Sequence, residues 1–238
     1  MKDPLCDSDS GTCAPAAVSS GSSDEPAAVT GTELIYVGDP MCSWCWGIAP
    51  ELQLLREECE RRQMSFRVVV GGLRPGGGDF WNEQARQTLA HHWQEVHKRS
   101  GQPFKFDLLD LPSFDYDTEP ACRAVVAARS LRAGSELDFF FAIQHQFYAE
   151  NEDPKLHEFY RGICADLDLD FDAFLERFES GEVKAQTREE FQISRNWGIR
   201  GYPSVLLLAG DRLYAIASGY SPFEQMRQRL DSLLAVPA

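Results

Sequence analysis

The chain has 238 residues, of which 43% are hydrophobic and 25% are charged, a composition that predicts one large globular domain or two small ones. Its net charge of −14 argues against nucleic acid and anionic membrane surfaces as partners, because both repel an acidic protein. No apolar run approaches the roughly 20 residues that span a bilayer, so we expect no membrane association.

The first 32 residues are rich in Ser, Gly, Ala, Pro, Thr and Asp and show no periodicity, which predicts a disordered tail. The segment Met1–Cys6 lacks the apolar stretch of an export signal. The chain also has seven cysteines, an odd number. These features lead us to expect a reducing, cytoplasmic location rather than a compartment in which structural disulfides form.

Two of the cysteines, Cys6 and Cys13, lie in this tail. They are either exposed thiols without a role or an auxiliary redox pair. Cys13 precedes Cys42 by 29 residues, and a flexible chain of that length spans about 30 Å. The tail cysteines can therefore reach the centre of the chain.

That centre is the sequence Pro-Met-Cys-Ser-Trp-Cys-Trp-Gly at 40–47, which follows a strand-like run and precedes a helical pattern. Strand, C-x-x-C and helix in this order indicate a dithiol site formed by Cys42 and Cys45. The free N–H groups and the dipole at the start of a helix favour a thiolate, so we expect a lowered pKa for Cys42. Half of a zinc site is the alternative, but no second C-x-x-C supplies the missing ligands.

Further elements are predicted from periodicity. Pro50 lies inside the first helical pattern and predicts a kink there. The pair Asp153-Pro154 predicts the start of a helix whose buried stripe includes Leu156. Three further cysteines fall on apolar helical faces and are expected in the core: Cys59, Cys122 and Cys164. Strands are predicted at 34–37, 66–70, 204–209 and 212–218. Helices are predicted at 48–63, 81–96, 136–150, 182–197 and 221–234. Three further helices are predicted by one end each: one begins near 117, one begins at 153, and one ends at 178.

A second motif, Gly-x-x-Gly-Tyr-Pro-Ser at 198–204, precedes the last two strands and the last helix. With the strand–C-x-x-C–helix unit it resembles the thioredoxin fold. Cys42 and Pro203 are 161 residues apart, far more than in a bare thioredoxin domain, and this arrangement resembles the DsbA family. The sequences Asp-Pro-Met-Cys-Ser-Trp-Cys-Trp-Gly (39–47), Gly-Gly-Leu-Arg-Pro-Gly (71–76) and Thr-Glu-Pro-Ala-Cys-Arg-Ala (118–124) resemble its cytoplasmic FrnE-like branch.

The resemblance covers Leu34 to Leu234 and implies an α/β fold, a thioredoxin fold with a large α-helical insertion domain. The expected organisation is a disordered tail at 1–32, a thioredoxin-like domain made of 33–78 and 182–238, and a helical insertion domain at 79–181.

The resemblance also implies a thiol–disulfide oxidoreductase in which Cys42 attacks and Cys45 resolves. Tyr202 and Pro203 match the cis-proline loop beside the dithiol, and with Ser43 and Trp44 they are the expected substrate-binding residues. The implied partners are proteins that carry disulfides or thiols, with glutathione or another thiol as reductant. The chemistry calls for no metal and no cofactor.

Two other functions stay open. Kappa-class glutathione transferases and hydroxychromene-carboxylate isomerases share this fold and insertion but work with a lone serine at the helix start, so the presence of Cys42 and Cys45 argues against them. A peptide-binding module without catalysis is the other alternative. The direction of exchange, as oxidase, reductase or isomerase, does not follow from the residues.

Overall fold

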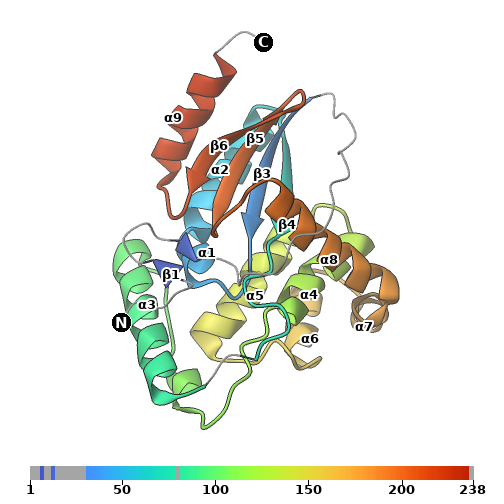
Figure 1. The fold of residues 1–238 in the computed structure, drawn as a ribbon. Helices are drawn as coiled ribbons and strands as arrows, with labels where there is room; N and C mark the ends of the chain where they lie inside the picture. Colours follow the sequence, from blue (N-terminus) through green and yellow to red (C-terminus); the bar gives the residue numbers. More distant parts are fainter. Residues whose placement is uncertain (1–5, 8–11, 14–30, 79–80, 236–238) are drawn as a thin grey trace.

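The computed structural model of the chain describes residues 6–7, 12–13, 31–78 and 81–235 (Figure 1). Most of the tail predicted to be disordered, residues 1–32, lies outside these described residues. Within it, two short strands, β1 (Cys6–Asp7) and β2 (Thr12–Cys13), pair antiparallel with each other.

The central sheet has four strands in the order β4-β3-β5-β6: β3 (Thr32–Gly38), β4 (Ser65–Val70), β5 (Ser204–Ala209) and β6 (Arg212–Ser218). β3 runs parallel to β4 and antiparallel to β5, and β5 and β6 form an antiparallel hairpin. The apolar run from Leu34 to Val37 is fully buried, as expected for a central strand that is covered on both faces.

Most of the helices lie between β4 and β5 in the chain and form the lower half of the molecule in Figure 1. α2 and α9 contact each other, α9 packs on β6, and α8 packs on β4. Their bounds are α1 (Ser43–Gly47), α2 (Ala49–Arg61), α3 (Glu83–Ser100), the 3₁₀ turn η1 (Asp107–Asp110), α4 (Glu119–Leu131), α5 (Glu136–Glu150), α6 (Phe159–Asp166), α7 (Phe171–Glu179), α8 (Gly181–Asn196) and α9 (Phe223–Leu234). The predicted fold class, a thioredoxin fold with a helical insertion, is confirmed.

Two local predictions are wrong in detail, and both involve proline. Pro50 does not kink one helix but lies in the first turn of a second helix, α2, where its missing N–H leaves no bond unmade. The pair Asp153-Pro154 does not begin a helix, because Asp153 instead makes a turn that accepts hydrogen bonds from Lys155 N and Leu156 N. α6 begins only at Phe159, and Leu156 is 61% exposed rather than buried.

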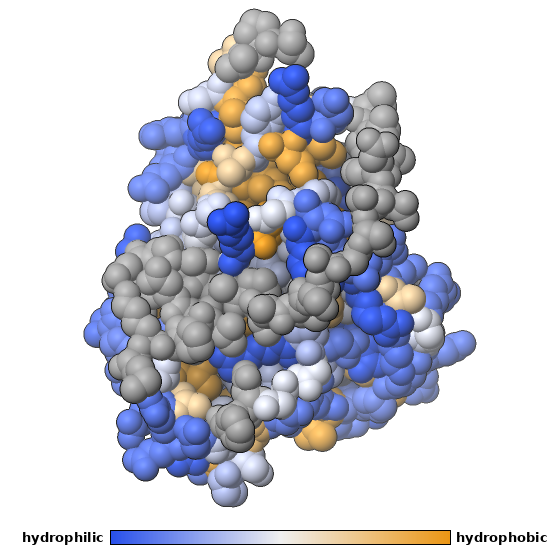
Figure 2. Space-filling view, viewed as in Figure 1, coloured by the Kyte–Doolittle hydropathy of each residue, from blue (hydrophilic) through white to orange (hydrophobic). Residues whose placement is uncertain are grey.

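One continuous hydrophobic cluster runs through the sheet and the inserted helices. The division into a thioredoxin-like domain and an insertion domain at 79–181 therefore stays a prediction. The face seen in Figure 2 is mostly hydrophilic, with a hydrophobic area over β5 and β6. Among the described residues, no helix combines the length and the apolar character that crossing a membrane requires.

The predicted core cysteines Cys59 and Cys164 are fully buried, and burial raises the pKa of their thiols to about 11 and about 12. A thiol in the unfolded chain has a pKa of about 8.5, so the stability that protonated thiols confer is complete below that pH and is lost as the pH rises toward the folded values. We expect each of these two thiols to lower the free energy of unfolding of the reduced protein by about 2 kcal/mol between pH 8 and pH 10.

Urea unfolding in the presence of a phosphine reductant measures this loss at the two pH values. A Cys59→Ala/Cys164→Ala variant is the matched control, because it lacks both thiols and should lose correspondingly less stability. An equal loss in the two proteins would contradict the assignment.

Candidate active site

The turn between β3 and α1 is built by Asp39, which is fully buried. Its backbone carbonyl accepts from Cys42 N at 3.0 Å, and its carboxylate accepts from Met41 N at 2.9 Å and from Leu73 N at 2.6 Å. These three bonds fix the backbone ahead of the helix. They place Cys42 at the N-cap of α1, with φ −88° and ψ 118°.

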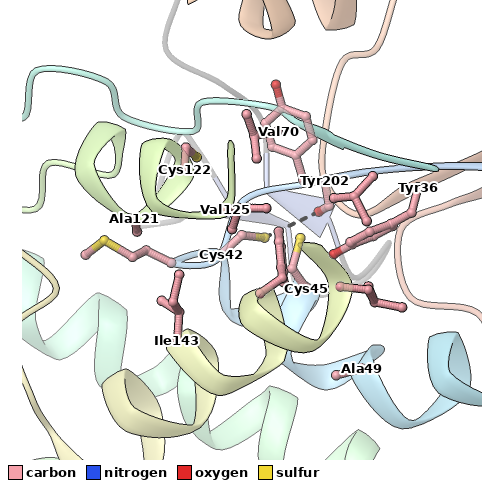
Figure 3. Packing of buried hydrophobic residues seen from close by; sticks show 14 of the residues in the cluster. Tyr36, Cys42, Cys45, Ala49, Val70, Ala121, Cys122, Val125, Ile143 and Tyr202 are labelled. Atoms are coloured by element: carbon pink, nitrogen blue, oxygen red, sulfur yellow. Dashed lines mark hydrogen bonds between the residues drawn. The ribbon is translucent and has the colours of Figure 1, made fainter. Parts of the chain in front are cut away.

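Cys42 and Cys45 are both free thiols with 0% exposure. The Cys42 thiol donates to the backbone carbonyl of Tyr202, with 3.7 Å between sulfur and oxygen, drawn as the dashed line in Figure 3. The Tyr202–Pro203 peptide bond is cis. The fold thus brings together two motifs whose contacting residues are 160 positions apart in the sequence. The predicted substrate-binding residues Ser43, Trp44, Tyr202 and Pro203 are all buried.

The expectation of a lowered pKa for Cys42 is wrong for this closed, reduced site. Burial raises the pKa of the Cys42 thiol well above its usual value, and contact with Cys45 and the charge of Asp39 raise it further. The backbone N–H of Cys45 does lower it, as the position at a helix start predicts. That local effect is smaller than the desolvation of the thiolate.

Tyr36 was not predicted as a site residue, yet its hydroxyl points toward Cys45 in Figure 3. Burial, followed by the interaction with Cys45, raises the pKa of this hydroxyl well above its ordinary value. The ring fits because Gly38 has no side chain: a Cβ there would lie 2.3 Å from the Tyr36 oxygen. A tyrosine in a buried strand is typical of an ordinary core, so no sequence pattern indicated this placement.

Cys122 was predicted only as a core residue, and it is fully buried. Its thiol also donates to the second carboxylate oxygen of Asp39 at 3.3 Å. A side-chain hydrogen bond from Thr118 also reaches Asp39, and the Thr118 hydroxyl accepts from Arg74 N at 3.0 Å. Both partners come from the Thr-Glu-Pro-Ala-Cys-Arg-Ala motif, so the insertion holds the turn that precedes Cys42.

The insertion also holds the dithiol helix itself. The Tyr116 hydroxyl donates to the carbonyl of Met41 at 2.8 Å, and Gln102 Nε2 donates to the carbonyl of Trp46 at 3.0 Å. Trp46 Nε1 in turn donates to Pro103 O at 3.0 Å, and its ring stacks on Tyr148 with centroids 6.3 Å apart. α1 is therefore fixed by groups from outside the sheet.

The side chain of Tyr202, a predicted substrate-binding residue, is fully buried, and its hydroxyl donates to Gly71 O at 2.6 Å. Its side chain is therefore held inside the core. Of Cys6 and Cys13 the structure gives the backbone alone, as partners across β1 and β2. In the part of the chain that the structure describes, no three His, Cys, Asp or Glu side chains form a cluster that could hold a metal ion.

Known proteins share this architecture. The family model of the DSBA-like thioredoxin domain matches residues 33–231. Similar solved structures include a proposed protein disulfide isomerase from Nitrosomonas europaea, 38% identical with a TM-score of 0.76, covering 86% of this chain and 98% of that one. The cytosolic disulfide reductase DsbM from Pseudomonas aeruginosa is 27% identical with a TM-score of 0.70, covering 85% of this chain and 98% of that one.

A 2-hydroxychromene-2-carboxylate isomerase is 13% identical with a TM-score of 0.57, covering 85% of this chain and 94% of that one, a likeness of fold alone. None of the curated proteins compared with the chain matches it. The match over residues 33–231 and the 38% identity over nearly a whole relative agree with the geometry at Cys42 and Tyr202. The chain belongs to the DSBA-like thioredoxin family, within the thioredoxin superfamily.

Proposed function

We propose that this protein, a thiol–disulfide oxidoreductase of the DsbA type, exchanges disulfides with protein or small thiol substrates through Cys42 and Cys45. The observation that carries the proposal is the position of the Cys42 thiol, at the N-cap of α1 and 3.7 Å from the Tyr202 carbonyl. A free dithiol lies there beside a backbone segment that can pair with an extended substrate.

The exchange takes two steps. The Cys42 thiolate attacks one sulfur of a substrate disulfide, the S–S bond breaks, and the released thiolate takes up a proton. Cys45 then attacks the Cys42 sulfur, so that the second substrate thiol leaves and the Cys42–Cys45 disulfide forms. The substrate gains two electrons and the protein loses two, and two external thiols restore the dithiol.

We further propose that the protein works as a reductase in the cytoplasm with glutathione as the external thiol. Two points support this: the neighbour at 27% identity is named a cytosolic disulfide reductase, and another structure of that protein contains GSH. Burial of Cys42 also raises its pKa and so favours the thiol over the thiolate in the reduced protein. A thiolate with a raised pKa is a poorer leaving group, and a disulfide that oxidises substrates needs a good one.

Insulin, a protein that carries disulfides, serves as the probe. Wild-type protein with glutathione should accelerate insulin reduction, and Cys42→Ser should return the rate to the uncatalysed background. Cys164→Ala is the control, since it removes a buried thiol of α6 that plays no part in exchange. Equilibration with glutathione buffers, followed by thiol trapping, then gives the potential. A value near −270 mV fits a reductase, and one near −120 mV contradicts that direction.

The alternatives give different results in the same assays. Glutathione conjugation that survives Cys45→Ser, with no insulin reduction, would support a transferase or isomerase. Peptide binding that is unaffected by a Cys42→Ser/Cys45→Ser double change, with no turnover in any assay, would support a binding module. If no disulfide forms between Cys42 and Cys45 at any ratio of reduced to oxidised glutathione, the redox function is wrong.

A further inference from the structure

The two tail cysteines lie directly opposite each other. In the antiparallel pair of β1 and β2, Cys6 is the register partner of Cys13. Opposite residues of an antiparallel pair have Cα atoms about 4.5 or 5.5 Å apart, depending on the hydrogen-bonding pattern. A disulfide spans Cα distances of about 4.4–6.8 Å, so the backbone places this pair at bonding separation in either pattern.

The same strand pair lies at the dithiol. β2, the strand that ends at Cys13, contacts α1 with Cα atoms within 8 Å, and Figure 1 shows β1 and β2 beside α1. α1 begins directly after Cys42 and contains Cys45. Cys42 itself has 0% exposure, so β2 lies against a helix whose reactive thiol is closed to solvent.

Resting on the proposed function, we propose that Cys6 and Cys13 form a second dithiol that exchanges electrons with the Cys42–Cys45 pair within one chain. The Cys13 thiolate attacks the Cys42 sulfur of the oxidised site, the Cys42–Cys45 bond breaks, and Cys45 takes up a proton. Cys6 then attacks Cys13, so that a Cys6–Cys13 disulfide forms and Cys42 leaves as a thiol. Two electrons pass from the tail pair to the site pair, and the reverse sequence passes them back.

Cys13 is the entry thiol because it ends β2, a strand that contacts α1. Tethering replaces a bimolecular step by an intramolecular one, with an effective concentration in the millimolar range. External thiol then has to reduce only the tail pair and does not have to enter the closed site. This relay, the transfer of electrons from the Cys6–Cys13 pair to the Cys42–Cys45 pair, therefore allows a bulky or dilute reductant to reduce the buried dithiol.

The mixed disulfide is the intermediate to trap. In full-length Cys45→Ala/Cys6→Ser protein, both cysteines that could resolve the Cys13–Cys42 bond are removed, so mild oxidation at low protein concentration should link Cys42 to Cys13. Peptide mapping of the monomeric fraction under non-reducing conditions identifies this bond. A Cys42 that carries only glutathione, in protein whose Cys13 is free or also carries glutathione, would overturn the relay.

A rate provides the second test. With glutathione at about 0.1 mM, we expect Cys6→Ser/Cys13→Ser to slow reduction of the Cys42–Cys45 disulfide about tenfold, the ratio of a millimolar effective concentration to the external one. Cys59→Ala/Cys164→Ala, which also lacks two cysteines, should keep the wild-type rate. Equal rates in all three proteins would overturn the relay and leave the proposed function standing. Wild-type protein that forms no Cys42–Cys45 disulfide would overturn both.

Discussion

Replacing Asp39 by asparagine is expected to weaken the fold and, at the same time, to make Cys42 more reactive. The two carboxylate oxygens of Asp39 accept from Met41 N and Leu73 N, and both bonds are buried. Asparagine has one acceptor oxygen, so its NH₂ group must face one of these two N–H groups. A buried N–H without a partner costs about 1–3 kcal/mol, and we expect a loss of at least that size.

The gain in reactivity has a separate cause. Burial is the main reason for the raised pKa of Cys42, but the charge of Asp39 adds to it. Removing that charge lowers the pKa of Cys42, so a larger fraction of thiolate is present at neutral pH. Urea unfolding measures the stability, and the pH dependence of alkylation of Cys42 measures the thiolate.

Asp138→Asn is the matched control. Asp138 is partly exposed and pairs with Arg56 at 2.6 Å, an interaction worth at most about 1 kcal/mol at a surface, and it does not touch the site. If the Asp39 variant unfolds at the same urea concentration as the control and its Cys42 alkylates with the wild-type pH profile, the role given to Asp39 is wrong.

Replacing Gly71 by alanine is expected to disturb the loop that holds Cys42. A Cβ at Gly71 would lie 2.3 Å from two ring carbons of Tyr202. Tyr202 is fully buried and cannot swing into solvent. Overpacking of this kind costs about 1–3 kcal/mol, and here it also moves the carbonyl to which the Cys42 thiol donates. We expect lower stability together with slower insulin reduction.

Gly162→Ala provides the comparison for this variant. Gly162 lies in α6, and the nearest atom to an added Cβ, on Gln146, is 4.0 Å away. Alanine in a helix interior is favoured over glycine, so this variant should gain up to about 1 kcal/mol and keep full activity. A Gly71 variant that behaves in the same way would contradict the close contact with Tyr202.

Local sequence patterns predicted the parts of the fold that depend on local interactions. The helix at 136–150 and the strands at 204–209 and 212–218 have the predicted bounds, because periodicity and turn residues define them. The start of α6 was placed too early, because Asp153-Pro154 serves equally well as a turn. The resemblance, not the periodicity, predicted that the segments holding Cys42 and Pro203 meet.

What could not be predicted depends on contacts distant in sequence. Asp39 matters because Leu73 and Cys122, 34 and 83 residues away, come to its carboxylate. The pKa of Cys42 was predicted from the helix start alone, and the desolvation that outweighs this effect comes from segments packed over it later in the chain. Tyr36 is one residue of a buried strand until the fold directs its hydroxyl toward Cys45.

The hydrogen bonds from Tyr116 to Met41 and between Trp46 and Pro103 couple the stability of the inserted segment to the dithiol. If oxidation alters the helix that these groups hold, the stability of the insertion must differ between the two redox states, and by linkage the insertion shifts the reduction potential. For a two-electron couple, a difference of about 1.4 kcal/mol corresponds to about 30 mV. Substitutions far from any sulfur can therefore set the direction in which electrons flow.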